Sequence, residues 1–447
     1  MKRKMLALIL ALTMALSLTA CGGEDAAVQE DDTAPEDQTE ENVQVQEPEA
    51  PAANYTVVES QPYSEGLAWV VYRDEGGTTY TGAMDKEGKV RFCIEGEAVR
   101  TTPFEDGQAY IETEDGLLLV DQDGLVYDFA SNLADGGLRA YGGGYAVVSR
   151  TVNDILEGRT TSHILVDSAG AERTLAHQVS TDGYASKGLF RGGDSGTYYV
   201  PQADLWLSDA AAEAGLPMWF PQTSVIGDYA ILYDLQYVHG GIPDNNGDLH
   251  LLYAGKDDTE ATFLDTSALP ELSNLAYAEF SITTAKTDCG LVSVEYDSTT
   301  LDGAEHTGKY FLDLENGTFL TYDGEYADLS FKDTFSVGDG KIALELTGRD
   351  SMTYLLMVDR QLNELSEPIQ VCYARENFIV DSYGIVSESG FYDLEGNQIS
   401  DGSFADLDLL SSLVGDGTVK TGEGVYCDYT GQQLFETIDA SGAQQLA

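Results

Sequence analysis

Basic residues are scarce in this sequence. Lysine and arginine number 23 against 77 aspartates and glutamates, and the formal net charge is −54. Nucleic-acid binding relies on basic side chains that neutralise phosphates, and direct adsorption to anionic lipid has the same requirement. The charge balance therefore argues against nucleic acid as a partner, and it permits cations, basic peptides and neutral glycans. The same carboxylates also keep an exported domain in solution without any ligand.

Long apolar runs are missing as well. The longest extends from residue 5 to residue 18 behind three basic residues. It is shorter than the about 20 residues of a membrane-spanning helix and has the flanks of a secretory signal. It ends in Leu18-Thr19-Ala20-Cys21-Gly22, which resembles a bacterial lipobox. Residues 1–20 are therefore expected to be a lipoprotein signal peptide with Cys21 as the acylated first mature residue. The alternative is an ordinary signal peptide followed by an incidental cysteine.

A linker without any lysine or arginine follows. Residues 22–54 hold 11 acidic side chains, and low hydrophobicity with charge of one sign predicts disorder. Because two or more acyl chains make membrane anchoring stable, residues 21–54 are expected to tether the protein to the extracytoplasmic side of the cell membrane. The leader carries +3 and the linker −11, which leaves −46 on residues 55–447.

Cysteines and histidines are few. Cys93, Cys289, Cys372 and Cys427 show no C-x-x-C spacing, and four cysteines allow three disulfide connectivities. Small buried hydrophobes are the simpler interpretation. The histidines are scattered, and none forms a three-ligand zinc pattern; they are His163, His177, His239, His250 and His306.

Motifs of known chemistry are incomplete. Residues 244–248 have the composition of a calcium loop, but the glycine is misplaced and Asn-Gly is a hairpin signal by itself. Residues 193–196, Gly-Asp-Ser-Gly, resemble the nucleophile motif of serine proteases, yet Thr197 stands where a second glycine is expected and no partner histidine has a matching motif. We therefore expect no catalytic residue, no metal and no cofactor.

Short β-strands with turn signals are abundant instead. In residues 103–129 three strands are expected, at 108–112, 117–120 and 125–127. Asp121-Gln122-Asp123-Gly124 lies between the last two, and a type I turn favours Asp first and Gly fourth. The unit is therefore an antiparallel meander, which alone would be marginal in water.

Copies of this unit recur along the chain. The pattern of two apolar or aromatic residues, Asp, two spacers and Gly returns at 83–88, 165–170, 391–396 and 426–431, with looser copies at 311–317 and 357–359. Openings of the form aromatic-x-x-Gly precede several copies, at 63–66, 104–107 and 141–144. A spacing of about 35 to 55 residues indicates an array, solenoid or propeller.

Residues 63–91 resemble a known bacterial repeat. Their sequence, YSEGLAWVVYRDEGGTTYTGAMDKEGKVR, is similar to the WG repeat, although Tyr80-Thr81-Gly82 replaces the Trp-Gly that names it. The likeness covers roughly residues 62–130, weakens to 172 and returns at about 335–435. The resemblance implies an all-β repeat domain and supplies no catalytic residue.

Residues 55–447 are thus expected to form a β-propeller of about 7–8 small antiparallel blades. We expect residues 55–58 to complete the last blade and close the ring, which would protect the sheet edges. An open stacked array is the structural alternative.

One segment interrupts the β pattern. Residues 209–215 predict a short helix with Gly215 at its C-terminus, and Trp219 and Phe220 follow between two prolines. These aromatics could bind a glycan or peptide, or pack the insertion onto the ring.

The sequence favours a lipid-anchored binding protein for an envelope glycan, peptide or protein. A carbohydrate-active enzyme with paired carboxylates and a purely structural spacer stay open as alternatives.

Overall fold

The computed structural model describes residues 54–134, 136–154, 158–181, 183–193, 197–216, 222–235, 249–264, 266, 269, 275–283, 287–373, 377–406 and 410–446. The predicted signal peptide, Cys21, nearly all of the linker, Trp219, Phe220, the 244–248 turn and residues 194–196 lie outside these ranges. Everything below concerns the body of the chain, Pro51–Ala447, which is a unit of its own.

The repeat unit folds as predicted. Three strands, β6 (Gln108–Glu112), β7 (Leu117–Asp121) and β8 (Gly124–Asp128), pair antiparallel behind the short β5 (Arg100–Thr101). Successive residues of a strand point to opposite faces, and both faces are covered here. Ala109 and Ile111 pack toward the preceding sheet, whereas Tyr110 packs toward the following one.

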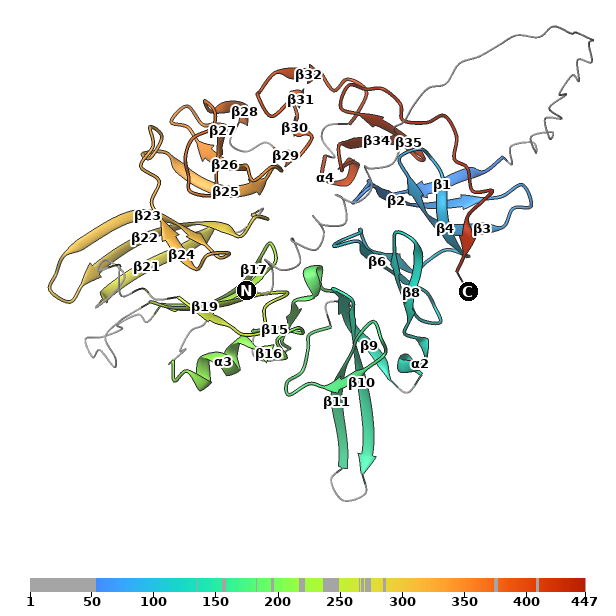
Figure 1. Cartoon of the computed structure of the whole chain (residues 1–447), viewed down its shortest axis with the longest axis horizontal. Helices are drawn as coiled ribbons and strands as arrows, with labels where there is room; N and C mark the ends of the chain where they lie inside the picture. Colours follow the sequence, from blue (N-terminus) through green and yellow to red (C-terminus); the bar gives the residue numbers. More distant parts are fainter. Residues whose placement is uncertain are drawn as a thin grey trace, which may run out of the picture. The chain divides into compact units, whose positions relative to one another are not determined.

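The strands of the described ranges form nine sheets, which we number as blades 1 to 9 in chain order (Figure 1). Blade 1 contains β1 (Thr56–Ser60), β2 (Leu67–Arg73), β3 (Thr79–Asp85), β4 (Val90–Glu95) and β36 (Gln444–Gln445). Blade 2 contains β5 to β8. Blade 3 contains β9 (Gly137–Gly142), β10 (Tyr145–Asp154), β11 (Gly158–Val166), β12 (Glu172–Thr174) and β13 (Gly183–Tyr184). Blade 4 contains β14 (Phe190–Arg191), β15 (Tyr198–Val200) and β16 (Leu205–Trp206).

The remaining blades follow the same order. Blade 5 contains β17 (Gln222–Ile226), β18 (Tyr229–Leu235), β19 (Leu249–Gly255) and β20 (Thr262–Phe263). Blade 6 contains β21 (Leu275–Thr283), β22 (Leu291–Thr300), β23 (Glu305–Asp313) and β24 (Thr318–Leu320). Blade 7 contains β25 (Ser330–Ser336), β26 (Ile342–Thr347), β27 (Met352–Val358) and β28 (Ile369–Tyr373). Blade 8 contains β29 (Phe378–Asp381), β30 (Gly384–Ser387), β31 (Gly390–Tyr392) and β32 (Gln398–Ser400), and blade 9 contains β33 (Val414–Gly415), β34 (Thr418–Gly422) and β35 (Val425–Asp428).

Nine apolar cores lie between these sheets, one for each pair of consecutive blades within the described residues. The ninth core joins Tyr426 and Ile438, at the end of the chain, to Tyr63, Val70 and Met84 of blade 1. A succession of sheets whose last member packs on the first is a closed ring, so the fold is an all-β propeller. The open stacked array is therefore wrong.

The predicted blade number of 7–8 is wrong, because the described strands alone form nine blades. Seven blades carry the Asp-containing turn that was counted in the sequence. Blades 4 and 5 lack it, and the strands of blade 4 are only two or three residues long. A repeat count based on one turn motif therefore misses both.

The predicted closing strand is also wrong. β1 pairs with β2 inside blade 1 instead of completing the last blade. The strand order of this sheet is β1-β2-β3-β4-β36, so the C-terminal strand is added beside β4. The C-terminal β36 pairs with β4 in parallel, and the Leu446 amide donates to the Cys93 carbonyl over 2.8 Å. The ring is thus closed by the C-terminal segment, residues 437–446, which we call the closing segment.

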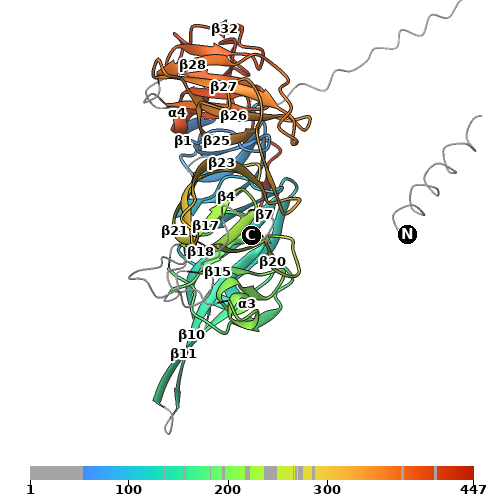
Figure 2. The ribbon, with the colours of Figure 1, turned by 90° about the vertical axis from the view of Figure 1, so that its left-hand side faces the viewer.

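The predicted helix is present with shifted bounds. It is α3 (Leu207–Glu213), whose Leu207, Ala210 and Ala211 are buried in the core between blades 4 and 5. The other helical turns among the described residues are short: α2 (Ala130–Leu133), η1 (Ser186–Gly188) and α4 (Leu410–Leu413). The long β10–β11 hairpin projects beyond its neighbours in both views (Figures 1 and 2). No helix in the described ranges is long and apolar enough to cross a membrane.

The four cysteines of the body are all free thiols. Cys93, Cys372 and Cys427 are buried, as the β contexts predicted, and no disulfide joins them. Cys289 is partly exposed in a turn of blade 6.

Candidate functional site

Two turns of every four-stranded blade lie at the same end, because the strands alternate in direction. The turn between the first and second strands and the turn between the third and fourth strands therefore share one face of the ring, which we call the turn face. Glu65-Gly66 and Asp106-Gly107 adopt positive φ at both positions (50° and 83°, 54° and 77°). This conformation is that of the tight type I′ turn.

Carboxylates on the turn face bind the turn of the next blade. Glu65 accepts hydrogen bonds from the backbone amides of Asp106 and Gly107, over 2.9 and 2.6 Å. Asp416 accepts from Gly66 over 2.7 Å, and Asp288 accepts from Ser336 over 2.8 Å. These bonds hold the turns in place before any ligand arrives.

The aspartate of the third-to-fourth strand turn caps its own turn, as predicted. Asp85, for example, accepts from the backbone amide of Lys89 over 2.8 Å, and Asp393 accepts from Asn397 over 2.7 Å. In several blades the next residue contacts the preceding blade: Lys86 donates to the Asp416 carbonyl over 2.7 Å. Neighbouring blades are thus joined by polar contacts on this face.

One cleft on the turn face is large enough for a small ligand. It has a volume of about 480 Å³ and spans blades 5, 6 and 7. Small-molecule sites occupy roughly 300–1,000 Å³. We call it the blade 5–7 cleft and define it by Asp228, Tyr229, Asp288, Glu315, Lys341 and Arg360.

The acidic wall of this cleft comes from blades 5 and 6. Asp288 is exposed to the cleft, but the surrounding protein removes much of the hydration of its carboxylate and raises its pKa, and the charge of Asp228 adds to the effect. Burial raises the pKa of Tyr229 to about 12, with a contribution from Glu315. The Tyr229 ring lies against Gly290, where a Cβ atom would be 2.8 Å from the ring.

The basic side chains of the cleft belong to blade 7. Arg360 is occupied by an ion pair of 2.5 Å with Asp313 and another of 3.0 Å with Glu315. Lys341 is exposed, and its ammonium group has no ion pair with any described residue. The cleft therefore combines carboxylates with one ammonium group that has no ion pair among the described residues.

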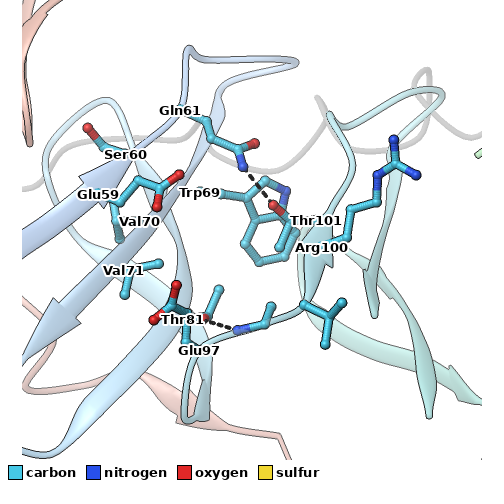
Figure 3. Close-up of a pocket in the computed structure, with 12 residues that line it drawn as sticks. Glu59, Ser60, Gln61, Trp69, Val70, Val71, Thr81, Glu97, Arg100 and Thr101 are labelled. Carbon is cyan, nitrogen blue, oxygen red and sulfur yellow. Dashed lines mark hydrogen bonds between the residues drawn. The ribbon is translucent and has the colours of Figure 1, made fainter. Parts of the chain in front are cut away.

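Three other hollows are less suited to a ligand. The hollow between blades 2 and 5, about 250 Å³, is lined by Lys256 and Lys187, which are ion-paired with Asp106 and Asp228. The hollow in Figure 3, about 150 Å³, lies beside Trp69 and is bordered by the Gln61–Thr101 hydrogen bond. A hollow of about 470 Å³ beside the closing segment has only acidic charged residues in its lining.

The described histidines singled out in the sequence do not line this cleft, and Trp219 and Phe220 lie outside the described residues. The His163 ring accepts a hydrogen bond from the Val179 amide, and burial lowers its pKa. His177 lies 2.9 Å from Asp209. His250 and His306 lie in β19 and β23, whereas His239 lies outside the described ranges. In the described part of the chain, no group of three or more His, Cys, Asp or Glu side chains is placed to hold a metal ion.

Comparisons with known proteins give a likeness of fold alone. No protein family matches the sequence, and no curated protein matches it. Among solved structures it is similar to the WD40 domain of SCAP from fission yeast, at 8% identity over 75% of this chain and 80% of that one, with a TM-score of 0.26. It is also similar to the β-propeller domain of the Trilobed protease from Pyrococcus furiosus, at 11% identity over 76% and 89%, with a TM-score of 0.28.

Prolyl oligopeptidase B from Galerina marginata is a third similar structure, at 10% identity and a TM-score of 0.28. The match covers 76% of this chain and 49% of that one, so this chain spans about half of its length. The propeller assignment depends on the nine sheets and nine cores described above, and none of the three similarities adds a function.

Proposed function

We propose that this chain is an exported, lipid-anchored binding protein of the cell envelope that recognises a peptide or protein partner through its turn face. The observation that carries the proposal is the blade 5–7 cleft, with carboxylates on blades 5 and 6 and the unengaged Lys341 on blade 7. Backbone turns held by interblade hydrogen bonds need little reordering on binding, which favours affinity. The resemblance of residues 63–91 to WG repeats belongs to the same proposal.

The membrane anchor is tested by replacing Cys21 with alanine. Because Cys21 is the residue proposed to carry the acyl chains, the variant is expected to leave the membrane fraction almost completely. Membrane fractionation and intact-mass spectrometry measure the outcome. Cys93→Ala, which removes a thiol in the ring, is the matched control and should remain with the membranes. An unchanged distribution of Cys21→Ala together with the absence of lipid mass contradicts the anchor.

The turn face is tested by capture from envelope material. The full mature chain with Cys21→Ala serves as bait, so that no lipid obscures the result. We expect one partner to be retained, and we expect Asp288→Lys to reduce its capture at least about tenfold, because a charge reversal in a recognition cleft is repulsive. Asp302→Lys, in the turn between β22 and β23, is the matched control. Equal capture by both variants contradicts recognition through the cleft.

A second candidate function, glycoside cleavage, is favoured by one observation. Asp288 has a raised pKa and shares its cleft with Asp228 and Glu315, and glycosidases use one protonated and one ionised carboxyl group. It ranks second because Asp288 already accepts the Ser336 amide, which is a structural role. Release of reducing sugar from envelope polysaccharide by the purified chain decides between the two functions.

A further inference from the structure

The blade 5–7 cleft is lined by acidic and basic side chains, and some of them are not paired with each other. Its acidic wall presents Asp228 and Asp288, and Asp288 uses one oxygen for the Ser336 amide. Asp228 is 3.4 Å from Lys256 and 3.6 Å from Lys187, so both of its oxygens are already ion-paired. An ionised carboxylate has about four acceptor positions, so Asp288 keeps acceptor capacity for a ligand.

Lys341 can bind a negative group. Lys341 belongs to the first turn of blade 7, next to Gly340, where a Cβ atom would meet nothing within 4 Å. The neighbouring Arg360 cannot serve in its place, because Asp313 and Glu315 already bind its guanidinium group. One ammonium group is therefore available for a carboxylate.

We propose that the blade 5–7 cleft binds a short zwitterionic peptide, whose ammonium group contacts Asp288 and whose carboxylate contacts Lys341. The assignment deepens the proposed function and depends on it, since it names the chemistry of the partner at the turn face. A peptide with no net charge gains nothing from the general attraction of an acidic body, so its binding requires both Asp288 and Lys341.

The unengaged groups of the cleft fit this ligand. Tyr229 lines the same cleft, and its hydroxyl group has no hydrogen-bond partner among the described residues. An arriving peptide can use it as a donor or acceptor. Loss of hydration makes the ionised form of Asp288 less stable, and a bound ammonium group offsets this loss. Binding is therefore expected to weaken as the pH falls through the raised pKa of Asp288.

The test uses three probes with the same side chains. Trialanine carries both charges, N-acetyl-trialanine lacks the ammonium group, and trialanine amide lacks the carboxylate. Calorimetric titration of the full mature chain with Cys21→Ala is expected to show binding of trialanine, weakened about 10- to 100-fold by either modification, as for the loss of a charged hydrogen bond. Because these changes are made in the ligand, protein folding cannot confuse the result.

Variants then test which side chain binds each charged end of the peptide. Asp288→Asn should weaken trialanine binding and remove the preference over the acetylated peptide, while Lys341→Gln should remove the preference over the amide. Asp302→Asn removes the same charge from the turn between β22 and β23 and should bind like the parent chain. Equal binding of all three probes, or no binding of trialanine, overturns the proposal. If trialanine fails while the turn face still captures a partner, the binding function stands and only this ligand assignment falls.

Discussion

Replacement of Trp69 by alanine is expected to lower the free energy of unfolding by about 3–5 kcal/mol. The side chain is 3% exposed and fills the core between blades 1 and 2. Its ring stacks on Phe104 with 5.4 Å between centroids, and its indole N–H donates to the Thr102 carbonyl over 2.6 Å. Removal of the indole ring leaves both a cavity and an unpaired Thr102 carbonyl. Urea denaturation monitored by circular dichroism measures the loss.

Trp69→Phe separates the two contributions. It keeps most of the ring volume but removes the indole donor, so a smaller loss of about 1–3 kcal/mol is expected. A loss below about 1 kcal/mol for the alanine variant would show that the interface between blades 1 and 2 is not a tight core. Because the hollow of Figure 3 lies beside this ring, the same variant also shows whether the hollow is structural.

Replacement of Arg360 by alanine is expected to cost about 3 kcal/mol or more, because breaking a buried ion pair leaves its partner uncompensated. The partner is Asp313, whose side chain is 3% exposed. Among the described residues it keeps the Asn316 side chain and the Glu315 amide as donors. Arg349→Ala is the matched control. Its pair with Asp328 is exposed (82% and 59%), and such pairs contribute about 0–1 kcal/mol. Similar losses for both variants would contradict the argument.

The pH dependence of the Arg360 variant provides a second measurement. Burial alone raises the pKa of Asp313, but hydrogen bonds from Arg360 and Asn316 outweigh it, and the pKa lies below its ordinary value. The stabilisation from this carboxylate is therefore complete above the unfolded pKa, about 3.9, and is lost as the pH falls through the folded pKa. Without Arg360, the largest lowering contribution is gone, so we expect the pKa of Asp313 to rise. The difference in the free energy of unfolding between the parent chain and the Arg360→Ala variant should consequently become smaller from pH 7 to pH 4.

The meander and its turns could be predicted because the determinants are local. Asp121, Asp85 and Asp393 each cap a turn within four residues, and the apolar runs beside them can only be short strands. The number of blades could not be read in the same way. Blade 4 is built on strands of two or three residues and a helix, and its place in the ring is set by the burial of Leu207 and Tyr199 between its neighbours.

The blade 5–7 cleft could not be predicted from the sequence. Its side chains come from positions 228 to 360, and only the curvature of the ring brings them together. Asp288-Cys289-Gly290 does share one feature with the openings that were recognised, a glycine at the turn. An acidic residue one or two positions before the glycine is shared by Gly66, Gly107 and Gly290, but Gly144 lacks it. This pattern does not indicate which of these acids remain open to a ligand.

The closing segment has a consequence for how the molecule is made. β36 completes a sheet whose other strands lie about 350 residues earlier in the chain. A ribosome releases the N-terminal blade long before this last partner exists, and contacts of such long range slow folding. Throughout that interval the outer edge of β4 is an unpaired strand, which can join another chain of the same kind. During synthesis the first blade therefore stays incomplete until β36 has been made. Contacts between nascent chains during that interval favour misassembly over ring closure.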